Sequence, residues 1–206
     1  MSNIVISTDS TADLSPELIA KHKISIAPLH VILGEEDYLD GVNITPQMIF
    51  DYVAKTGVLP KTSACSVEQY LTLFAELLKN NDEVIHFDIS TDCSSSGVNA
   101  KLAAESFNGK VHVIDTRQLS TGQGLLVMKA VDLRAEGKSA KEIVDYIESI
   151  KTKTQTSFVV DTTDYLCKGG RCSSVANLMA NIFKIHPSID MKDGKLGVKK
   201  KYRGKL

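Results

Sequence analysis

The chain has 206 residues, of which 43% are hydrophobic and 24% charged, the composition of a soluble globular protein. This composition excludes an intrinsically disordered, collagen-like or low-complexity chain. The formal net charge of −1 at pH 7 gives no support to a protein that binds nucleic acid or acidic lipid through its overall charge.

Neither a membrane segment nor an export signal is recognisable. No apolar run approaches the roughly 20 residues of a membrane-spanning helix. The N-terminal stretch Met1–Asp9 lacks the basic and long apolar regions of a secretion signal. In such a chain the four cysteines are expected to be reduced thiols: Cys65, Cys93, Cys167 and Cys172. The sequence therefore predicts a cytoplasmic protein.

Strand and helix patterns alternate through about the first 160 residues. Ser15-Pro16 and Thr45-Pro46 each combine an N-cap residue with a proline at the first helical position. We expect strands at 4–6, 83–89, 111–114 and 157–160, a β-rich segment at 24–33, a polar loop at 61–66, and helices at 16–22, 46–55, 67–79, 97–106, 120–135 and 141–150. This alternation predicts an α/β fold with a mostly parallel sheet and flanking helices.

The pattern changes after Asp161. A short helix is expected before Gly169-Gly170, another at about 174–183, and two strands within 185–198 around Asp193-Gly194, a dipeptide that favours a hairpin turn. We therefore expect two lobes, an N-terminal α/β lobe at residues 1–154 and the start of a second α/β lobe at residues 155–206.

Positive charge is concentrated at the end of the chain. Asp193 is the only acidic residue between positions 192 and 206, against seven basic ones: Lys192, Lys195, Lys199, Lys200, Lys201, Arg203 and Lys205. Such an end fits a nucleic acid-binding tail, a protein-docking patch or a solvated strand.

Small hydroxyl side chains recur at predicted strand ends and in loops. In open α/β sheets, ligands bind where the carboxyl ends of strands lead into loops and helix N-termini. Hydroxyls and free N–H groups at these places suit a carboxylate or a phosphate. Ordinary N-capping explains any one of these loops, but all four together favour an anion site: 8–11, 62–63, 90–97 and 115–124.

The triple serine Ser94-Ser95-Ser96 is the most specific of these features. Serine hydrolysis needs a base and an orienting acid near one serine, and no Gly-x-Ser-x-Gly elbow occurs. His86 and His112 lie on apolar strands and are expected to pack. A serine triad is therefore not expected.

The other motifs with a chemical interpretation are weaker. The segment 120–124 suits a phosphate cradle but lacks the lysine and spacing of a P-loop, and a helix start that needs close backbone approach explains it equally well. Cys167 and Cys172 do not have zinc-ligand spacing, and Asp9 and Asp13 suit capping and turns better than magnesium. We expect no metal.

Taken together, these segments resemble the DegV family of bacterial fatty-acid-binding proteins. The similarity spans the whole chain, and its parts occur in family order. They are the segments 8–14, 38–42, 60–63, 89–100, 115–116, 166–171 and 202–205.

The resemblance implies two α/β lobes that enclose one long-chain fatty acid. The acyl chain would lie in an apolar tunnel, with the carboxylate held between the lobes. Family members of this kind hand the bound acid to a separate ATP-dependent kinase, which makes acyl-phosphate for phospholipid synthesis. They act as carrier subunits with no catalytic nucleophile, cofactor or metal of their own.

The family's carboxylate-binding residues match Thr62, with Ser63 beside it, and the segment Ser94-Ser95-Ser96. Ser95 stands where the family has glycine, and Ser96-Gly97 offers an alternative register. The arginine associated with kinase engagement matches Arg203. Family members continue past this segment and contribute a histidine to the carboxylate, so we expect this chain to be truncated and its second lobe to be incomplete.

Two other functions remain open. An enzyme of similar architecture would act on a small phosphorylated or carboxylated metabolite through the loops 94–96 and 120–124, in a compact polar pocket without an apolar tunnel. The basic end would alternatively bind nucleic acid, although only Tyr202 interleaves it with an aromatic ring, and we expect no nucleic acid partner.

Overall fold

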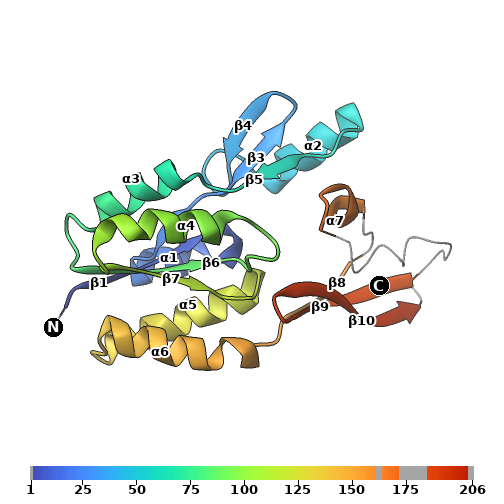
Figure 1. Cartoon of the computed structure of the whole chain (residues 1–206). Coiled ribbons are helices and arrows are strands. Elements are labelled where there is room, and N and C mark those ends of the chain that lie inside the picture. The colour runs from blue at the N-terminus through green and yellow to red at the C-terminus, as the bar shows by residue number, and fades with distance from the viewer. Residues whose placement is uncertain (1, 161–163, 172–184, 204–206) are drawn as a thin grey trace.

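The computed structural model describes residues 2–160, 164–171 and 185–203, and these residues form three sheets (Figure 1). The largest is a four-stranded parallel sheet of order β2-β1-β6-β7. Its strands are β1 (Ile4–Asp9), β2 (Ser25–Ala27), β6 (Glu83–Asp88) and β7 (Val111–Asp115). The predicted α/β fold with a parallel sheet and flanking helices is confirmed.

Helices cover both faces of this sheet (Figure 1). They are α1 (Pro16–His22), α3 (Val67–Leu77), α4 (Ser96–Ala104), α5 (Ser120–Ala135) and α6 (Ala140–Ile150). Successive strand residues point to opposite faces. Thus Ile4 and Ile6 of β1 pack in one apolar cluster with α5 and α6, whereas Val5 packs in a second cluster with α3 and α4.

Local sequence accounts for several helix starts. Ser15 and Thr45 accept hydrogen bonds from backbone N–H groups as N-caps, with proline following each. Ser66 and Ser139 each form a reciprocal capping box with a residue three positions on, which satisfies two backbone donors at the helix start. The predicted caps before α1 and α2 (Pro46–Thr56) are therefore confirmed.

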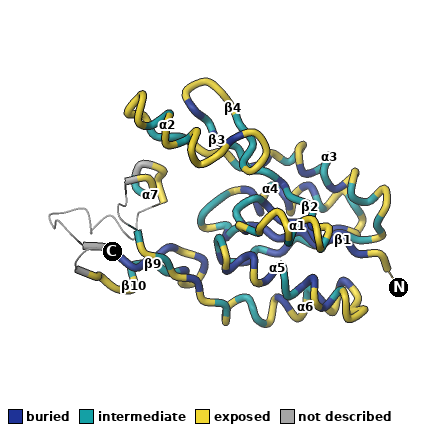
Figure 2. Tube along the Cα trace, turned by 180° about the vertical axis from the view of Figure 1, so that it is seen from behind, coloured by how far each residue is buried: buried dark blue, intermediate teal, exposed yellow. Residues whose placement is uncertain are grey.

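A small antiparallel sheet of order β4-β3-β5 projects from the body with α2 beside it (Figure 1). Its strands are β3 (His30–Leu33), β4 (Glu36–Leu39) and β5 (Lys61–Ser63). The prediction of a polar loop at 61–66 is wrong for 61–63, because pairing of these residues with β3 forms a strand. Figure 2 shows how exposed this unit is, and α2 has no buried residue.

The third sheet has the order β10-β9-β8 and is antiparallel. Its strands are β8 (Ser157–Val159), β9 (Ile185–Lys192) and β10 (Lys195–Arg203). The predicted Asp193-Gly194 turn is confirmed, and both residues have the positive φ that a tight hairpin turn requires. The short helix α7 (Asp164–Lys168) precedes Gly169 as expected, whereas the helix expected at 174–183 lies outside the described residues.

The cysteines differ from one another. Cys65 and Cys93 are free, as predicted. Cys167 is disulfide-bonded, so the expectation of a reduced thiol is wrong there. Cys172 lies outside the described residues. In the part of the chain that the structure describes, no helix is long and apolar enough to cross a membrane.

Candidate functional site

The carboxyl ends of β1 and β6 form the switch point of the parallel sheet. Strand β2, which follows β1 in the chain, pairs with one edge of β1. Strand β6 pairs with the other edge, and β7 lies beyond β6. Open α/β sheets bind ligands at this position. Two fully buried carboxylates mark it, because Asp9 ends β1 and Asp88 ends β6.

Asp9 is surrounded by hydrogen-bond donors. Its carboxylate accepts from the backbone N–H of Thr11 at 3.0 Å and of Ile89 at 2.8 Å. The Thr11 hydroxyl at 2.6 Å and Gln123 Nε2 at 2.8 Å also donate to it. The capping role predicted for Asp9 is confirmed. Burial, and secondarily the nearby Asp88, raises the pKa of Asp9 above its usual value.

The glycines in the segment 120–124 allow α5 to pack closely on this loop. A Cβ at Gly124 would lie 2.7 Å from the backbone oxygen of Ala12, and one at Gly122 would collide with the Thr156 side chain. Close backbone approach at the start of a helix therefore accounts for Gly124, and close packing on the Thr156 side chain accounts for Gly122.

The three serines of the loop after β6 have different environments. Ser96, the first residue of α4, is fully buried, Ser94 is half-buried and Ser95 is exposed. The backbone at Ser95 is right-handed helical (φ −77°), so its side chain introduces no backbone strain. Ser94 Oγ accepts from Ser96 N–H at 3.2 Å, and no described group accepts the hydrogen of the Ser94 hydroxyl.

The buried Ser96 hydroxyl forms a hydrogen bond with the phenol of Tyr70 of α3. The Tyr70 hydroxyl donates its single hydrogen to Asp88 Oδ1 at 2.9 Å. The 2.6 Å contact between Tyr70 Oη and Ser96 Oγ is therefore donated by Ser96. Burial, together with the charge of Asp88, raises the pKa of Tyr70, so the phenol keeps its hydrogen. The Ser96 hydrogen is consequently directed away from the protein surface.

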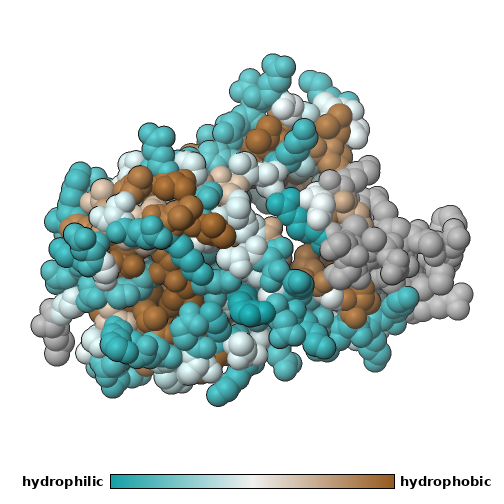
Figure 3. Space-filling model, in the orientation of Figure 1, coloured by the Kyte–Doolittle hydropathy of each residue, from teal (hydrophilic) through white to brown (hydrophobic). Residues whose placement is uncertain are grey.

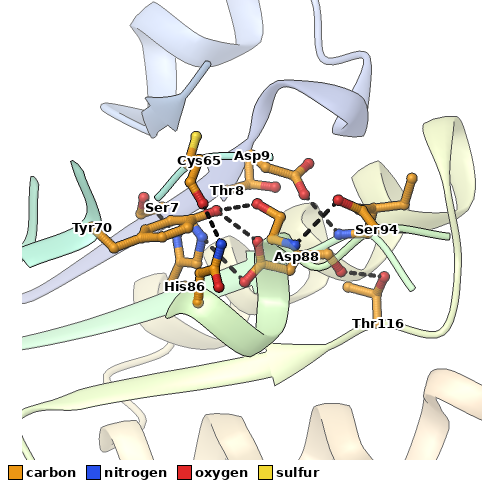
Figure 4. Close-up of polar contacts among 12 residues, drawn as sticks. Ser7, Thr8, Asp9, Cys65, Tyr70, His86, Asp88, Ser94 and Thr116 are labelled. Atoms are coloured by element: carbon orange, nitrogen blue, oxygen red, sulfur yellow. Dashed lines mark hydrogen bonds and ion pairs between the residues drawn. The ribbon is translucent and has the colours of Figure 1, made fainter. Parts of the chain in front are cut away.

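His86 extends this buried network to β1. Its Nδ1 lies 3.0 Å from Ser7 Oγ, and its Nε2 lies 3.4 Å from Asp88 Oδ2 (Figure 4). His86 Nε2 and Asp88 Oδ2 have no hydrogen bond within the described part of the chain. The predicted burial of His86 is confirmed, whereas His112 is partly exposed and lies 3.0 Å from Glu83. Because Ser7 is fully buried, the Ser7–His86–Asp88 group offers no nucleophile to a substrate.

The turn of the β9–β10 hairpin docks on the serine loop. Ser90 Oγ donates to the carbonyl oxygen of Gly194 at 2.6 Å, and the Arg117 guanidinium donates to that of Asp193. Cys93 also packs in the apolar cluster of the third sheet. The loop that carries the triple serine is therefore held between the parallel sheet and the hairpin.

The other predicted site residues lie outside the serine loop. Thr62 and Ser63 are exposed on β5, and the loop after them is tied to α4 because Asn99 Nδ2 donates to the Cys65 carbonyl at 2.7 Å. Arg203 ends β10, and its side chain lies outside the described part of the structure. No distance therefore connects Arg203 with the serines.

Cavities of different polarity lie near these elements. An apolar one of about 110 Å³ is lined by Ile26, Ala27, Pro28, Leu39, Cys65, Gln69, Tyr70 and Leu73. A polar one of about 370 Å³ lies where the segment 151–157 meets the β9–β10 hairpin, and its lining includes Arg117, Lys151, Lys192 and Lys199. The face of the molecule seen in Figure 3 is also hollowed beneath the unit formed by the small sheet and α2. The described residues contain no group of three metal-ligating side chains.

Sequence reasoning missed Tyr70 and Asp88 as polar residues of the site, and it named Gln123 only as part of the segment 120–124. Tyr70 occupies a core position of an amphipathic helix, and Asp88 ends an apolar strand. Only the position of Asp88 at a strand end was a usable signal, because carboxyl ends of parallel strands meet at one edge.

These features define an open α/β protein in which polar loops at the switch point of a parallel sheet contact a second, antiparallel sheet. The sequence model of a protein family described as "Uncharacterised protein, DegV family" matches residues 3–206. The chain belongs to the DegV family.

Relatives share both sequence and fold with this chain. A DegV domain-containing protein of Deinococcus radiodurans is 33% identical over 202 residues, which are 98% of this chain and 72% of the relative. "Fatty Acid Binding of a DegV family Protein from Thermus thermophilus" describes a structure 32% identical, with a TM-score of 0.92, covering 98% of this chain and 72% of that one. A stearic acid-binding protein from Eubacterium ventriosum is 32% identical, with a TM-score of 0.87, covering 100% and 72%. These relatives are longer than this chain.

Proposed function

We propose that this protein binds one long-chain fatty acid and presents it to a separate ATP-dependent kinase, without a nucleophile, ATP site or cofactor of its own. Membership of the DegV family and the fatty acids named for two relatives support the ligand class. The observation that carries the proposal is the Ser94 hydroxyl, whose hydrogen is accepted by none of the residues that the structure describes, at a helix start beside the sheet's switch point.

In this proposal Ser94 is the main donor to the fatty acid carboxylate within the triple serine. A hydroxyl that donates to a carboxylate forms a charge-assisted bond, about twice as strong as a neutral one. Thr62 and Ser63 are proposed as further donors because both are exposed on β5. The exposed Ser95 is proposed as a contact at the edge of the site. Ser96 is proposed to act indirectly, because its hydroxyl hydrogen is bound to Tyr70.

The acyl chain is proposed to begin in the apolar cavity beside Cys65 and Tyr70. That cavity, at about 110 Å³, is smaller than the roughly 300–1,000 Å³ of typical ligand pockets, so it holds only part of a long chain. Each buried CH₂ contributes about 0.8 kcal/mol, so chain burial would supply most of the affinity.

The kinase is proposed to dock on the basic strand β10. Lys199, Lys200 and Lys201 follow one another on this strand, and the family resemblance assigns kinase engagement to Arg203. An acidic partner surface would complement this charge and accelerate association at low salt. Charge reversal at Lys199 and Lys201 should weaken kinase coupling without altering fatty acid affinity.

We also propose that the lobes divide at residues 154/155. Helix α6 ends at Ile150, a short 3₁₀ helix continues to Lys153, and Ser157 begins the strand that pairs with β9. Limited proteolysis that cleaves first between Lys151 and Thr156 would support this boundary, and first cleavage within α5 or α6 would oppose it.

The second candidate function is that of an enzyme that acts on a small phosphorylated or carboxylated metabolite. The polar cavity of about 370 Å³ has the polarity that it requires. The described residues that line this cavity include neither the triple serine nor the segment 120–124, through which such an enzyme was expected to act.

Native mass spectrometry of the protein purified from cells without added lipid tests the carrier function. A fatty acid is expected to co-purify, and titration with stearate is expected to saturate at one molecule per chain. The substitution Ser94→Ala should weaken stearate binding about 10- to 100-fold, the effect of one charge-assisted hydrogen bond. Absence of both a co-purified acid and binding on titration would refute the proposal.

A further inference from the structure

A chain of hydrogen bonds links Ser94 to the buried residues Ser96, Tyr70 and Asp88. Ser96 donates its backbone N–H to Ser94 Oγ and its hydroxyl to Tyr70, and Tyr70 donates to Asp88. Asp88 and Ser96 are fully buried, and Tyr70, also fully buried, borders only the apolar cavity proposed for the acyl chain, so none of the three is placed to bind the carboxylate. Any influence of Tyr70 or Asp88 on the binding of the carboxylate therefore passes through Ser96 and Ser94.

Hydrogen counting gives this chain one direction. A carboxylate oxygen only accepts, so Tyr70 donates to Asp88 and has no second hydrogen for Ser96. Ser96 must donate to Tyr70, and this bond holds the Ser96 side chain in the rotamer that points inward. Serine hydroxyls otherwise form local hydrogen bonds readily, and the Ser94 hydroxyl, which already accepts the Ser96 backbone N–H, lies in the same loop.

We infer that Tyr70 and Asp88 are positioning residues for carboxylate binding, which turn the Ser96 hydroxyl inward and so leave the hydrogen of Ser94 free for the ligand. This inference rests on the proposed fatty acid function and adds the residues that determine the choice of a carboxylate head group. Without Tyr70, the Ser96 hydroxyl is free to rotate and to accept the Ser94 hydrogen.

The neighbouring groups agree with a fixed arrangement. Asp88 Oδ2, the oxygen that Tyr70 does not bind, faces His86 Nε2 at 3.4 Å. The ring of His86 makes edge contacts with Tyr70 and Phe74 at centroid distances of 5.2 and 5.4 Å. Gly97 lets α4 approach closely, because a Cβ there would lie 3.3 Å from Asp88 Cβ. Both ends of the Tyr70–Asp88 bond are therefore packed in place.

The test compares stearate with octadecan-1-ol, which has the same chain length and no carboxylate. Tyr70→Phe should weaken stearate binding about tenfold and leave octadecanol binding within about twofold, because a carboxylate can only accept the Ser94 hydrogen, whereas an alcohol can donate its own hydrogen to Ser94 instead. Leu77→Ala is the matched control on the same face of α3, where Leu77 packs in the same apolar cluster. It disturbs packing but no hydrogen bond of the chain, so it should not change the ratio of the two affinities.

Two further variants separate hydrogen-bond direction from charge and from packing. Asp88→Asn keeps an acceptor for Tyr70 and should retain the preference for stearate. Adding Ser96→Ala to Tyr70→Phe removes the competing hydroxyl and should restore that preference, which a merely structural defect would not do.

Each outcome decides the inference. An unchanged affinity ratio in Tyr70→Phe, equal losses for both ligands, or failure of Ser96→Ala to restore the ratio would overturn it. So would a loss in Asp88→Asn as large as that in Tyr70→Phe. If the unmodified protein binds neither ligand, or if Ser94→Ala binds stearate normally, the proposed function or its site has failed, and the inference fails with it.

Discussion

The Ser90 hydroxyl donates a 2.6 Å hydrogen bond to the carbonyl oxygen of Gly194, which lies 104 positions later in the chain. Ser90 begins the loop that carries the triple serine, and Gly194 is in the turn of the β9–β10 hairpin. The bond is buried, and a Cβ at Gly194 would lie 2.8 Å from Ser90 Oγ. The candidate site is therefore built against the hairpin.

Removing this contact should destabilise the junction measurably. Ser90→Ala leaves the Gly194 carbonyl oxygen with only the weak Cys93 thiol donor at 3.9 Å, so the free energy of unfolding should fall by about 1–3 kcal/mol. Arg117→Ala removes the donor to the neighbouring carbonyl of Asp193. Because both bonds hold one turn, a double-mutant cycle in urea should show losses that are not additive.

Lys195→Ala is the control for this cycle. Lys195 lies on the same hairpin and its ammonium is 3.7 Å from Asp92, but 73% of its side chain is exposed. Such a surface pair contributes about 0–1 kcal/mol, so the variant should remain close to the parent. Strictly additive losses at Ser90 and Arg117 would show that the two contacts act independently.

Gly124→Ala should destabilise the protein although alanine favours helices. Helix propensity alone would stabilise the variant by about 1 kcal/mol. The new Cβ, however, would lie 2.7 Å from the Ala12 carbonyl oxygen, and such overpacking costs about 1–3 kcal/mol. Chemical denaturation measures the balance, and Leu125→Ala, at a side chain that is 63% exposed on the same helix, is the control. A stabilised Gly124→Ala would contradict the close packing of α5 on the loop after β1.

Glu142 should titrate far below an ordinary glutamate. It accepts hydrogen bonds from the backbone N–H and hydroxyl of Ser139 in the capping box of α6, and these, with Lys138, lower its pKa to about 2. Because the folded-state pKa is the lower one, the stabilisation is complete above the unfolded value near 4.5 and is lost as the pH falls through about 2.

Carbon-detected NMR of the Glu142 carboxyl tests this prediction. Its pKa should be about 2 in the unmodified protein and should rise toward the usual range in Ser139→Ala. A Glu142 pKa that is ordinary in the unmodified protein, or that does not respond to Ser139→Ala, would show that the capping box does not form in solution.

Cys65 should resist alkylation in the folded protein. Burial raises the pKa of its thiol to about 11, and only 3% of the residue is exposed. Because the thiolate is the reactive form, iodoacetamide at pH 8 should modify Cys65 slowly in native protein and rapidly in urea. Peptide mass spectrometry gives both rates, and rapid modification in the native state would indicate that the cavity beside Tyr70 opens.

The architecture was predictable because it depends on local patterns. Apolar runs such as 83–88 identify buried parallel strands, and Ser15-Pro16 and Thr45-Pro46 mark helix starts through backbone hydrogen bonds a few residues long. The strand at 61–63 was missed because Lys-Thr-Ser has no strand pattern of its own. It becomes a strand only through pairing with β3.

By itself, the sequence determined the α/β alternation, the hairpin at Asp193-Gly194 and the family, since each depends on short patterns or their order along the chain. Only the tertiary structure decided the roles within the triple serine. The partners that distinguish Ser96 from Ser94 are Tyr70, 26 positions from Ser96, and Asp88, 18 positions from Tyr70. A hydrogen bond depends on distance and direction in space, and no spacing along the sequence encodes which of three adjacent hydroxyls has its hydrogen already bound.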